Sequence, residues 1–429
     1  MIKNKAYFDN LKKLENSCLQ NHTCLEIDLR RKIGSKSQRF FNQNSGQNLS
    51  SALQKCINLT NLILQANGTQ IDDKNAIYLG SALGVNTNLQ ILTLNLGYNE
   101  IGPQGVQDLV PSFSNCANLS NLDLDLTRNI IGEKGLQFLG AALTILQNLS
   151  SLKLQLDGNQ VKDIGLQSLG SALSNCKYLT NLALGLQKNE ISCKGISNFG
   201  SALVDCQNLS TIQLKLYGNQ IKSIGASALC TALQKCPKLQ NFELNLDSQK
   251  VLNKSNAVQR FSSSLQNFSN LQKLDLSLCD CDIKPKSASV IGSALAKCSN
   301  LQTLKLFLIQ NFIGPEDASE LGFTLVNCAN LQNLKLDLGK NEIGDQGILN
   351  LGQALINCPK LISLNLDLQS NNIFDSGALN FGSALLKCTN LLSLELILYY
   401  NEIKESSLLK IQIKLLKIKK LVNSYIYFY

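Results

Sequence analysis

Asp123 and Asp125 lie two residues apart in the stretch LSNLDLDLTRNIIG, residues 119–132. If this stretch is a strand, both carboxylates project from the same face, roughly 7 Å apart. Two acids at that distance can carry general acid–base chemistry, one as proton donor and the other as acceptor. The stretch is therefore either a catalytic pair or a strand whose outward positions happen to be acidic.

An internal period of about thirty residues favours the second interpretation. Leucine recurs from Leu59 to Leu421 at intervals of 30 residues, with one interval of 32 between Leu239 and Leu271. Because the chain repeats, equivalent positions can be compared between units. Neighbouring units place unrelated residues at the positions of the two acids: Thr93 and Asn95, Lys153 and Gln155, Ala183 and Gly185. We interpret the two acids as outward-facing contacts on a strand built by leucines.

Each unit reads as a strand, a turn and a helix. The consensus LxxLxLxLxxNxIGxxGxxxLGxALxxCxN is almost intact in residues 331–360. Apolar residues alternate from Leu334 to Leu338, which is typical of a half-buried strand, and Asn341 follows where a turn exposes backbone groups. Helical spacing begins after Gly347. A small residue recurs at the position of Gly352, which indicates close packing of the helix on the sheet.

This unit resembles the leucine-rich repeats of the ribonuclease-inhibitor type, and the resemblance covers roughly residues 25–429. The resemblance implies an α/β solenoid, a horseshoe with parallel strands on the concave face and helices on the convex face. The chain departs from that family by an extra x-Leu pair before the Asn. Two added residues preserve the facing of later side chains, so we expect strands one pleat longer than usual.

The period also predicts how the chain is organised. Residues 1–24 are expected to form a cap, with an amphipathic helix over 6–19. The array then comprises an irregular first unit (25–58), regular units (59–238), a 32-residue unit (239–270), further regular units (271–420) and a truncated last strand (421–429). We expect a break in curvature near 248–257. The apolar strand 424–429 is expected to be covered by another chain, as in a homodimer, or to belong to a truncated product.

The net charge of +9 lies entirely at the two ends. Residues 1–44 carry nine basic and four acidic side chains, residues 402–429 carry six and two, and the middle carries 25 of each. A nucleic-acid-binding surface needs clustered Lys and Arg on one face, so the neutral array argues against nucleic acid. The ends are suited either to acidic partners or anionic lipid, or simply to solvation.

The cysteines are expected to pack rather than to react. Nine of the fifteen cysteines occupy one position at the end of the helix (Cys56, Cys116, Cys176, Cys206, Cys236, Cys298, Cys328, Cys358 and Cys388). Leu146 and Phe268 occupy the same position in other repeats, which favours packing over redox chemistry at this position. Cys18, His22 and Cys24 could supply three zinc ligands, but the spacing is abnormal and a fourth ligand is missing. His22 is the only histidine. We predict no catalytic residue, metal or cofactor.

The compartment follows from what the sequence lacks. Its start is charged, without the apolar core of a secretory signal, and it contains no apolar run long enough to cross a membrane. Fifteen cysteines in such a chain favour a reducing compartment. We expect the protein in the cytoplasm, with the nucleus as the alternative.

The function predicted from these features is a non-enzymatic scaffold that binds a protein on its concave face. Two alternatives stay open: a GTPase activator resembling the Ran GTPase-activating proteins, and a sensor or regulatory fragment of a larger nucleotide-binding or kinase-linked protein. Outward strand positions and exposed aromatics supply the candidate partner-binding residues: Asp123, Asp125, Asp157, Lys215, Phe307, Ile309, Lys335, Asp337, Asp367, Ile397, Tyr399 and Tyr400.

Overall fold

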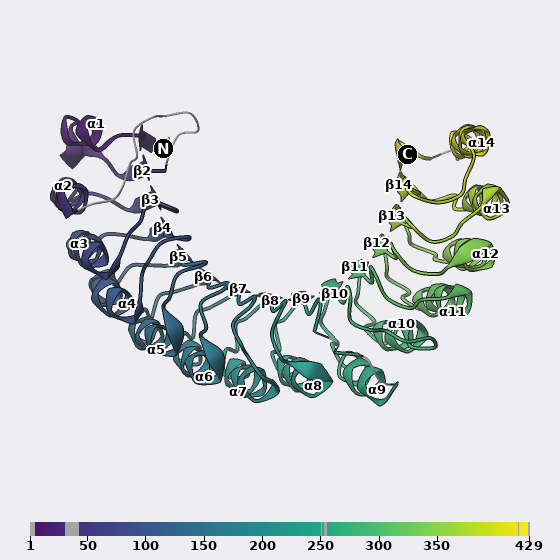
Figure 1. The fold of residues 1–429 in the computed structure, drawn as a ribbon, viewed down its shortest axis with the longest axis horizontal. Helices are drawn as coiled ribbons and strands as arrows, with labels where there is room; N and C mark the ends of the chain where they lie inside the picture. Colours follow the sequence, from purple (N-terminus) through teal and green to yellow (C-terminus); the bar gives the residue numbers. More distant parts are fainter. Residues whose placement is uncertain (1–4, 31–42, 250, 253–254, 419, 428–429) are drawn as a thin grey trace. The chain divides into compact units, whose positions relative to one another are not determined.

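The computed structural model describes residues 5–30, 43–249, 251–252, 255–418 and 420–427. They fall into two compact units, the first comprising Met1–Gln220 with Lys235–Lys238 and the second Ile221–Gln234 with Leu239–Tyr429. Strand and helix alternate in both units (Figure 1).

The first unit contains eight strands among the described residues: β1 (Lys5–Phe8), β2 (Cys24–Asp28), β3 (Asn61–Gln65), β4 (Ile91–Asn95), β5 (Asn121–Asp125), β6 (Ser151–Gln155), β7 (Asn181–Gly185) and β8 (Thr211–Lys215). Its helices are α1 (Leu11–Glu15), η1 (Leu19–Asn21), α2 (Gln43–Gln54), α3 (Asp73–Leu83), α4 (Pro103–Leu109), η2 (Val110–Asn115), α5 (Gly132–Leu143), α6 (Lys162–Leu173) and α7 (Cys193–Leu203).

The second unit begins with α8 (Lys222–Leu233) and continues the alternation. Its described strands are β9 (Asn241–Asn245), β10 (Lys273–Ser277), β11 (Thr303–Phe307), β12 (Asn333–Asp337), β13 (Ser363–Asp367), β14 (Ser393–Ile397) and β15 (Asn423–Tyr427). Its further helices are α9 (Ser255–Ser263), α10 (Ala288–Leu295), α11 (Pro315–Leu325), α12 (Gly344–Leu355), α13 (Asp375–Leu385) and α14 (Glu405–Leu415).

Within each unit the strands pair in chain order, all parallel, and the register steps by one repeat. Leu334 lies opposite Leu364, for example, and Leu364 opposite Leu394. The strands form the inner layer of each unit and the helices the outer layer (Figure 1). The predicted fold class, an α/β solenoid of strand–turn–helix units, is therefore confirmed. We call the side of the strand layer that points away from the helices the strand face.

The core lies between the two layers and is built from the periodic leucines. Leu334 is 2% exposed and Leu336 and Leu338 are fully buried, as are Ile348 and Leu351 on the facing helix. Burying each such side chain contributes about 2 kcal/mol. The backbone ladder continues beyond the five-residue strand, because the N–H of Leu338 donates to the carbonyl of Asp367 at 2.9 Å. The extra x-Leu pair thus extends the paired region.

The turn asparagine joins one repeat to the next through a fixed set of hydrogen bonds. The Asn341 side-chain amide donates to the carbonyls of Leu308 and Leu338, at 3.0 and 2.9 Å. Its oxygen accepts from the backbone N–H groups of Asn311 and Ile313, at 3.1 and 3.2 Å. One buried amide therefore satisfies backbone groups of two successive turns. Equivalent bonds form at other repeats (Asn99, Asn129, Asn159, Asn189, Asn219, Asn311, Asn371 and Asn401).

Three repeats use another residue at this position and still bond the turn. The Thr69 hydroxyl donates to the carbonyl of Ala66 at 2.7 Å. The Cys281 thiol donates to the carbonyl of Leu246 at 3.3 Å, and the Gln249 side chain accepts from the N–H of Ile221 at 3.2 Å.

The recurrent small residue packs against a neighbouring helix rather than the sheet. A Cβ added to Gly352 would lie 2.7 Å from the ring of Phe381 on α13. Similarly, a Cβ on Gly382 would lie 3.2 Å from Ile411 on α14. The prediction of close packing is correct, but its partner was wrong, because in-register stacking places side chains of the next helix against these glycines.

The ends of the described chain differ from prediction at one point. A helix over 6–19 was wrong: Lys5–Phe8 forms strand β1, paired with β2, and only Leu11–Glu15 is α-helical. An edge strand satisfies the backbone groups along the open side of β2, which a helix cannot do. At the other end, β15 pairs with β14, with Ile426 opposite Leu396.

Several predictions fall outside what is described. Residues 31–42 of the irregular first unit, residues 250 and 253–254 of the unusual turn, and residues 428–429 of the last strand are not described. The break in curvature and the covering of strand 424–429 therefore stay predictions. No helix among the described residues combines the length and apolar character needed to cross a membrane.

Replacing Asn341 by alanine should lower the free energy of unfolding by about 3 kcal/mol, because buried carbonyls and N–H groups lose their partners. Urea denaturation of the full chain measures the change. Asn330→Ala is the matched control: Asn330 is half-buried, its amide donates to the carbonyl of Ser299 at 2.8 Å, and, among the described residues, its side-chain oxygen accepts only from the Lys360 ammonium, at 2.6 Å. The control should cost less than about 1 kcal/mol. Equal losses in the two variants would contradict the role assigned to the turn amide.

Candidate functional site

The strand face of the second unit brings eight of the twelve predicted contact residues together. Parallel, in-register pairing of β11 to β14 places equivalent outward residues side by side, about 4.8 Å apart. The rows that result run across the strands: Lys305, Lys335, Asn365 and Glu395; Phe307, Asp337, Asp367 and Ile397; and, just beyond the strands, Ile309, Gly339, Gln369 and Tyr399.

Two neighbouring carboxylates lie at the centre of this surface. Asp337 and Asp367 pair directly across β12 and β13 and are only 7% and 9% exposed. Each accepts a hydrogen bond from the backbone two residues on, Asp337 from the N–H of Gly339 at 3.1 Å and Asp367 from the N–H of Gln369 at 3.0 Å. Burial, with a smaller effect of the Asp367 charge, raises the pKa of Asp337 to about 6.

The burial of these acids on an otherwise open face has a local cause. Gly339 has no side chain, and a Cβ there would lie 2.9 Å from Cγ of Gln369 and 3.4 Å from Oδ1 of Asp337. The Gln369 side chain therefore occupies the space above Gly339, beside the carboxylate. Burial also raises the pKa of Asp367, which takes part in the same row.

A lysine and a phenylalanine border the acids on one side. The Lys335 ammonium lies 5.5 Å from the centroid of the Phe307 ring, in cation–π range. The same positive charge lowers the pKa of Asp337 and Asp367, against the larger effect of burial. Ile309, two residues beyond the end of β11, is half-buried.

Tyrosines border the acids on the other side. The Tyr399 ring lies 6.4 Å from Tyr400 and 6.3 Å from Tyr427 of β15, centroid to centroid. Tyr400 is 79% exposed and adopts a left-handed backbone conformation, φ 54°. Ile397 pairs with Tyr427, yet both Ile397 and Tyr399 stay half-exposed. The last strand covers these two predicted contacts only in part.

Sequence reasoning missed Glu395 and Gln369. The Asn365 amide donates to the Glu395 carboxylate across β13 and β14, and the Glu395 charge raises the pKa of Asp367. The thirty-residue step places Glu395 beside Asn365, so extending the row of outward positions by one repeat would have found it.

The remaining four predicted residues lie on the strand face of the first unit. Asp123, from the opening pair, forms an ion pair with Lys153 at 2.9 Å, and Asp125 accepts from the N–H of Thr127 at 2.8 Å. Each acid thus has its own partner. Asp157 accepts from the N–H of Gln187 at 2.8 Å.

Burial is the main reason that the pKa of Asp157 is raised, with the Asp125 charge a smaller one. Lys215 lies exposed on β8. The first unit therefore has the same kind of acid held by turn backbone, without the cluster of aromatic residues seen in the second unit.

Comparison with known proteins bears on this architecture. A family model described as "Leucine Rich repeat" matches residues 85–110 and 330–352, one segment in each unit. Both segments contain the strand, the turn asparagine and the start of the helix. These two segments are therefore similar to leucine-rich repeats, and the other units share their order of strand, turn and helix.

Among solved structures, an internalin (inlF) from Listeria monocytogenes is similar to this chain, with 20% sequence identity and a TM-score of 0.48. The similarity covers 88% of each chain. No protein of curated function matches the sequence significantly.

The cysteines of the repeats serve the helix ends. The Cys206 thiol donates to the carbonyl of Leu173 at 3.3 Å, and the Cys298 thiol donates to that of Leu265 at 3.2 Å. These carbonyls belong to the helix end of the preceding repeat and lack an intrahelical partner. Burial raises the pKa of Cys206 to about 12 and of Cys298 to about 11, which keeps the thiols protonated. All fifteen cysteines are free.

The zinc candidates do not form a cluster. Cys18 is exposed, Cys24 is buried, and the His22 ring lies against Phe8 and within 3.2 Å of the Ser17 hydroxyl. Within the described ranges, no group of three His, Cys, Asp or Glu side chains is placed to hold a metal ion.

The raised pKa of Asp337 predicts a pH dependence of stability. A carboxyl with a folded pKa of about 6 and an ordinary value of 3.8 gives stability that is fully present below pH 3.8. That stability is lost as pH rises from 3.8 through 6. In this range the carboxyl ionises freely in the unfolded state, whereas burial opposes its ionisation in the folded state. Asp337→Asn should match the wild type near pH 4 and exceed its stability at pH 7 by about 2 kcal/mol.

Thermal and urea unfolding across this pH range test the prediction. Lys335→Met serves as a companion variant. Removing this positive charge should raise the pKa of Asp337 in the folded state further, so the loss of stability should extend to higher pH. A constant difference between wild type and Asp337→Asn at all pH values would show that Asp337 is not desolvated in the folded protein.

Thiol labelling tests the role of the cysteines. Brief alkylation of the folded chain near neutral pH should modify Cys18, which is exposed, and Cys193, which is half-buried. Cys279 should react slowly, because burial raises its pKa to about 11. The buried helix-end thiols should react only after unfolding in urea, as read by peptide mass spectrometry. Rapid native labelling of Cys206 or Cys298 would contradict their packing.

Proposed function

We propose that this protein is a non-enzymatic leucine-rich-repeat scaffold that binds a partner protein on the strand face of its second unit. The observation that carries the proposal is the in-register row Phe307, Asp337, Asp367 and Ile397, with Tyr399 and Tyr400 at its end. Repeat solenoids present extended surfaces of this kind to their partners. Exposed aromatic residues beside charged groups are the usual anchors of an interface.

The chemistry of the row indicates the character of the partner. Two desolvated carboxylates and Glu395 attract cations, and the flanking Tyr399 and Phe307 rings offer apolar area and cation–π contacts. An Arg- or Lys-containing segment with apolar neighbours is complementary to this arrangement. A bound cation would also compensate the burial of the acids, so binding and ionisation of Asp337 support one another.

Three finer points belong to the same proposal. We infer repeats of the ribonuclease-inhibitor type, since the units combine a strand, an Asn turn and an α-helix in 30 residues. We place the protein in the cytoplasm or nucleus on its free thiols. We also propose the Asp123–Asp125 pair of the first unit, with Asp157 and Lys215, as a contact surface of that unit.

The experiment compares partner capture by three forms of the full chain in its native cell type, using proximity labelling and quantitative pull-down. The face variant combines Asp337→Asn, Asp367→Asn, Tyr399→Ala and Tyr400→Ala. Partners that use the strand face should fall at least tenfold in this variant, because anchors of an interface typically contribute 2 kcal/mol or more each, of the order of tenfold in affinity.

The control variant carries the same kinds of change away from the strand face. It combines Asp205→Asn, Glu316→Gln, Phe323→Ala and Tyr178→Ala, all at exposed positions. The control should retain every partner, and both variants should keep a cooperative thermal transition. If the face variant captures the same proteins in the same amounts as the control, the binding surface lies elsewhere.

A further inference from the structure

One rim of the second unit carries charge of a single sign. It consists of the loops that join each helix to the next strand, residues 296–302, 326–332, 356–362, 386–392 and 416–422. These loops contain no Asp or Glu in the sequence. Their described lysines are exposed, and we call this set with its loops the basic rim (Lys297, Lys360, Lys387, Lys417 and Lys420).

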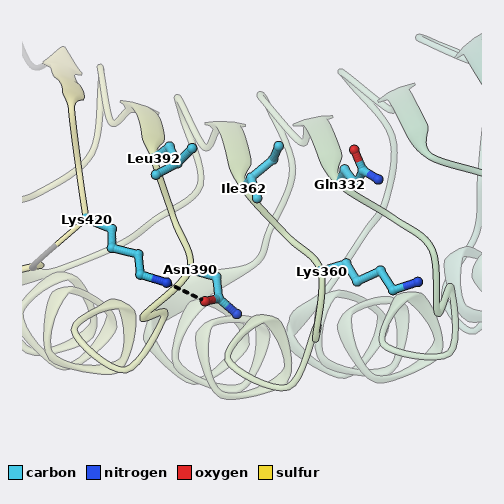
Figure 2. Close-up of a pocket in the computed structure, with 6 residues that line it drawn as sticks. All are labelled: Gln332, Lys360, Ile362, Asn390, Leu392 and Lys420. Carbon is cyan, nitrogen blue, oxygen red and sulfur yellow. Dashed lines mark hydrogen bonds between the residues drawn. The ribbon is translucent and has the colours of Figure 1, made fainter.

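The lysines of the basic rim have neutral partners. The Lys360 ammonium donates to Oδ1 of Asn330 at 2.6 Å, and the Lys420 ammonium donates to Oδ1 of Asn390 at 3.2 Å (Figure 2). Among the described residues, neither ammonium lies in an ion pair with a carboxylate. The positive charge of the rim is therefore uncompensated and faces solvent.

Exposed aliphatic side chains lie between these lysines. Leu392 is 41% exposed, Leu416 78% and Val422 77%. The N–H of Val422 donates to the carbonyl of Leu392, so the two residues are neighbours along the rim. Figure 2 shows Leu392 and Ile362 in a row above Asn390 and the two lysines. These residues line an open hollow of about 400 Å³.

We propose that the basic rim docks on a lipid bilayer that contains anionic lipids. Lysines that face a negative surface gain about 1 kcal/mol each, and exposed aliphatic residues beside them enter the headgroup region. The rim has no aromatic side chain on which a base could stack, so it is poorly suited to single-stranded nucleic acid. Two copies of the rim repel one another, since both are positive.

The strand face and the basic rim are different surfaces of the second unit. Lysine-rich loops contact the bilayer, whereas the carboxylates of the strand face stay available to a partner. The docking site is therefore independent of the proposed protein-binding site, and either can fail without the other.

Vesicle co-sedimentation of the full chain tests the inference. The probe is phosphatidylcholine vesicles with about 30% phosphatidylserine, compared with pure phosphatidylcholine. The full chain should sediment with the anionic vesicles only, and less as salt rises from about 0.1 to 0.5 M. Lys360→Glu, Lys387→Glu and Lys420→Glu together should weaken binding more than tenfold. Leu392→Ser with Val422→Ser should weaken it severalfold at unchanged charge.

The matched control reverses three exposed lysines of the same unit that lie outside the rim: Lys273→Glu, Lys284→Glu and Lys340→Glu. This variant has the same net charge as the rim variant and should keep most of the vesicle binding. Equal losses in the two charge variants would overturn the inference, because net charge alone would then explain binding.

Two other results would also overturn the inference. One is competition by single-stranded RNA with no effect of the serine substitutions, which would identify a polyanion site. The other is a dimer in sedimentation velocity that the rim variant dissociates, which would identify a second copy as the occupant. Binding of the wild type that is lost only in the rim and serine variants supports the bilayer.

Discussion

The buried turn amide sets the geometry on which everything else in each unit depends. Asn341 bonds the carbonyls of Leu308 and Leu338 and accepts from two backbone N–H groups of the preceding turn. An amide that satisfies groups in two turns holds them at one spacing and in one register. Register in turn places every outward strand residue beside its counterpart in the next repeat. The rows of the strand face, and the lysines of the basic rim, exist because this alignment is kept from turn to turn.

The repeated part of the fold was predictable because its signals agree with one another. Leu334 and Leu336 alternate as a strand requires, and Leu351 and Leu355 recur as a helix requires. The prediction failed where the period is absent. Residues 5–8 lie only 19 residues before β2, outside the thirty-residue pattern, and their helix-like spacing was overridden by the open edge of β2. Gly352 illustrates a different limit, since its small size predicted a close contact but not which element supplies it.

The candidate site was predictable in position more than in chemistry. Strand parity placed Phe307, Asp337, Asp367 and Ile397 outward, and the structure puts them in one row. Strand parity does not predict how deeply an outward side chain is buried. Asp337 is desolvated because Gln369, from the next repeat, fills the space that Gly339 leaves, a relation between three residues that no single repeat contains. The basic rim was missed because net charge was summed over stretches of sequence. Its lysines are spread over separate repeats and come together only along one rim of the second unit.

Opening of the repeat array has a chemical consequence, because it exposes the thiols at the helix ends. While the repeats are stacked, the thiols of Cys206 and Cys298 donate to carbonyls of the preceding repeat, and burial, which raises their pKa, keeps them protonated. When a stretch of repeats separates, several sulfurs at matching positions reach solvent together, where they ionise and react far more readily. The thiols that complete the helix ends therefore report whether the repeats are packed, because their reactivity changes when the stack opens.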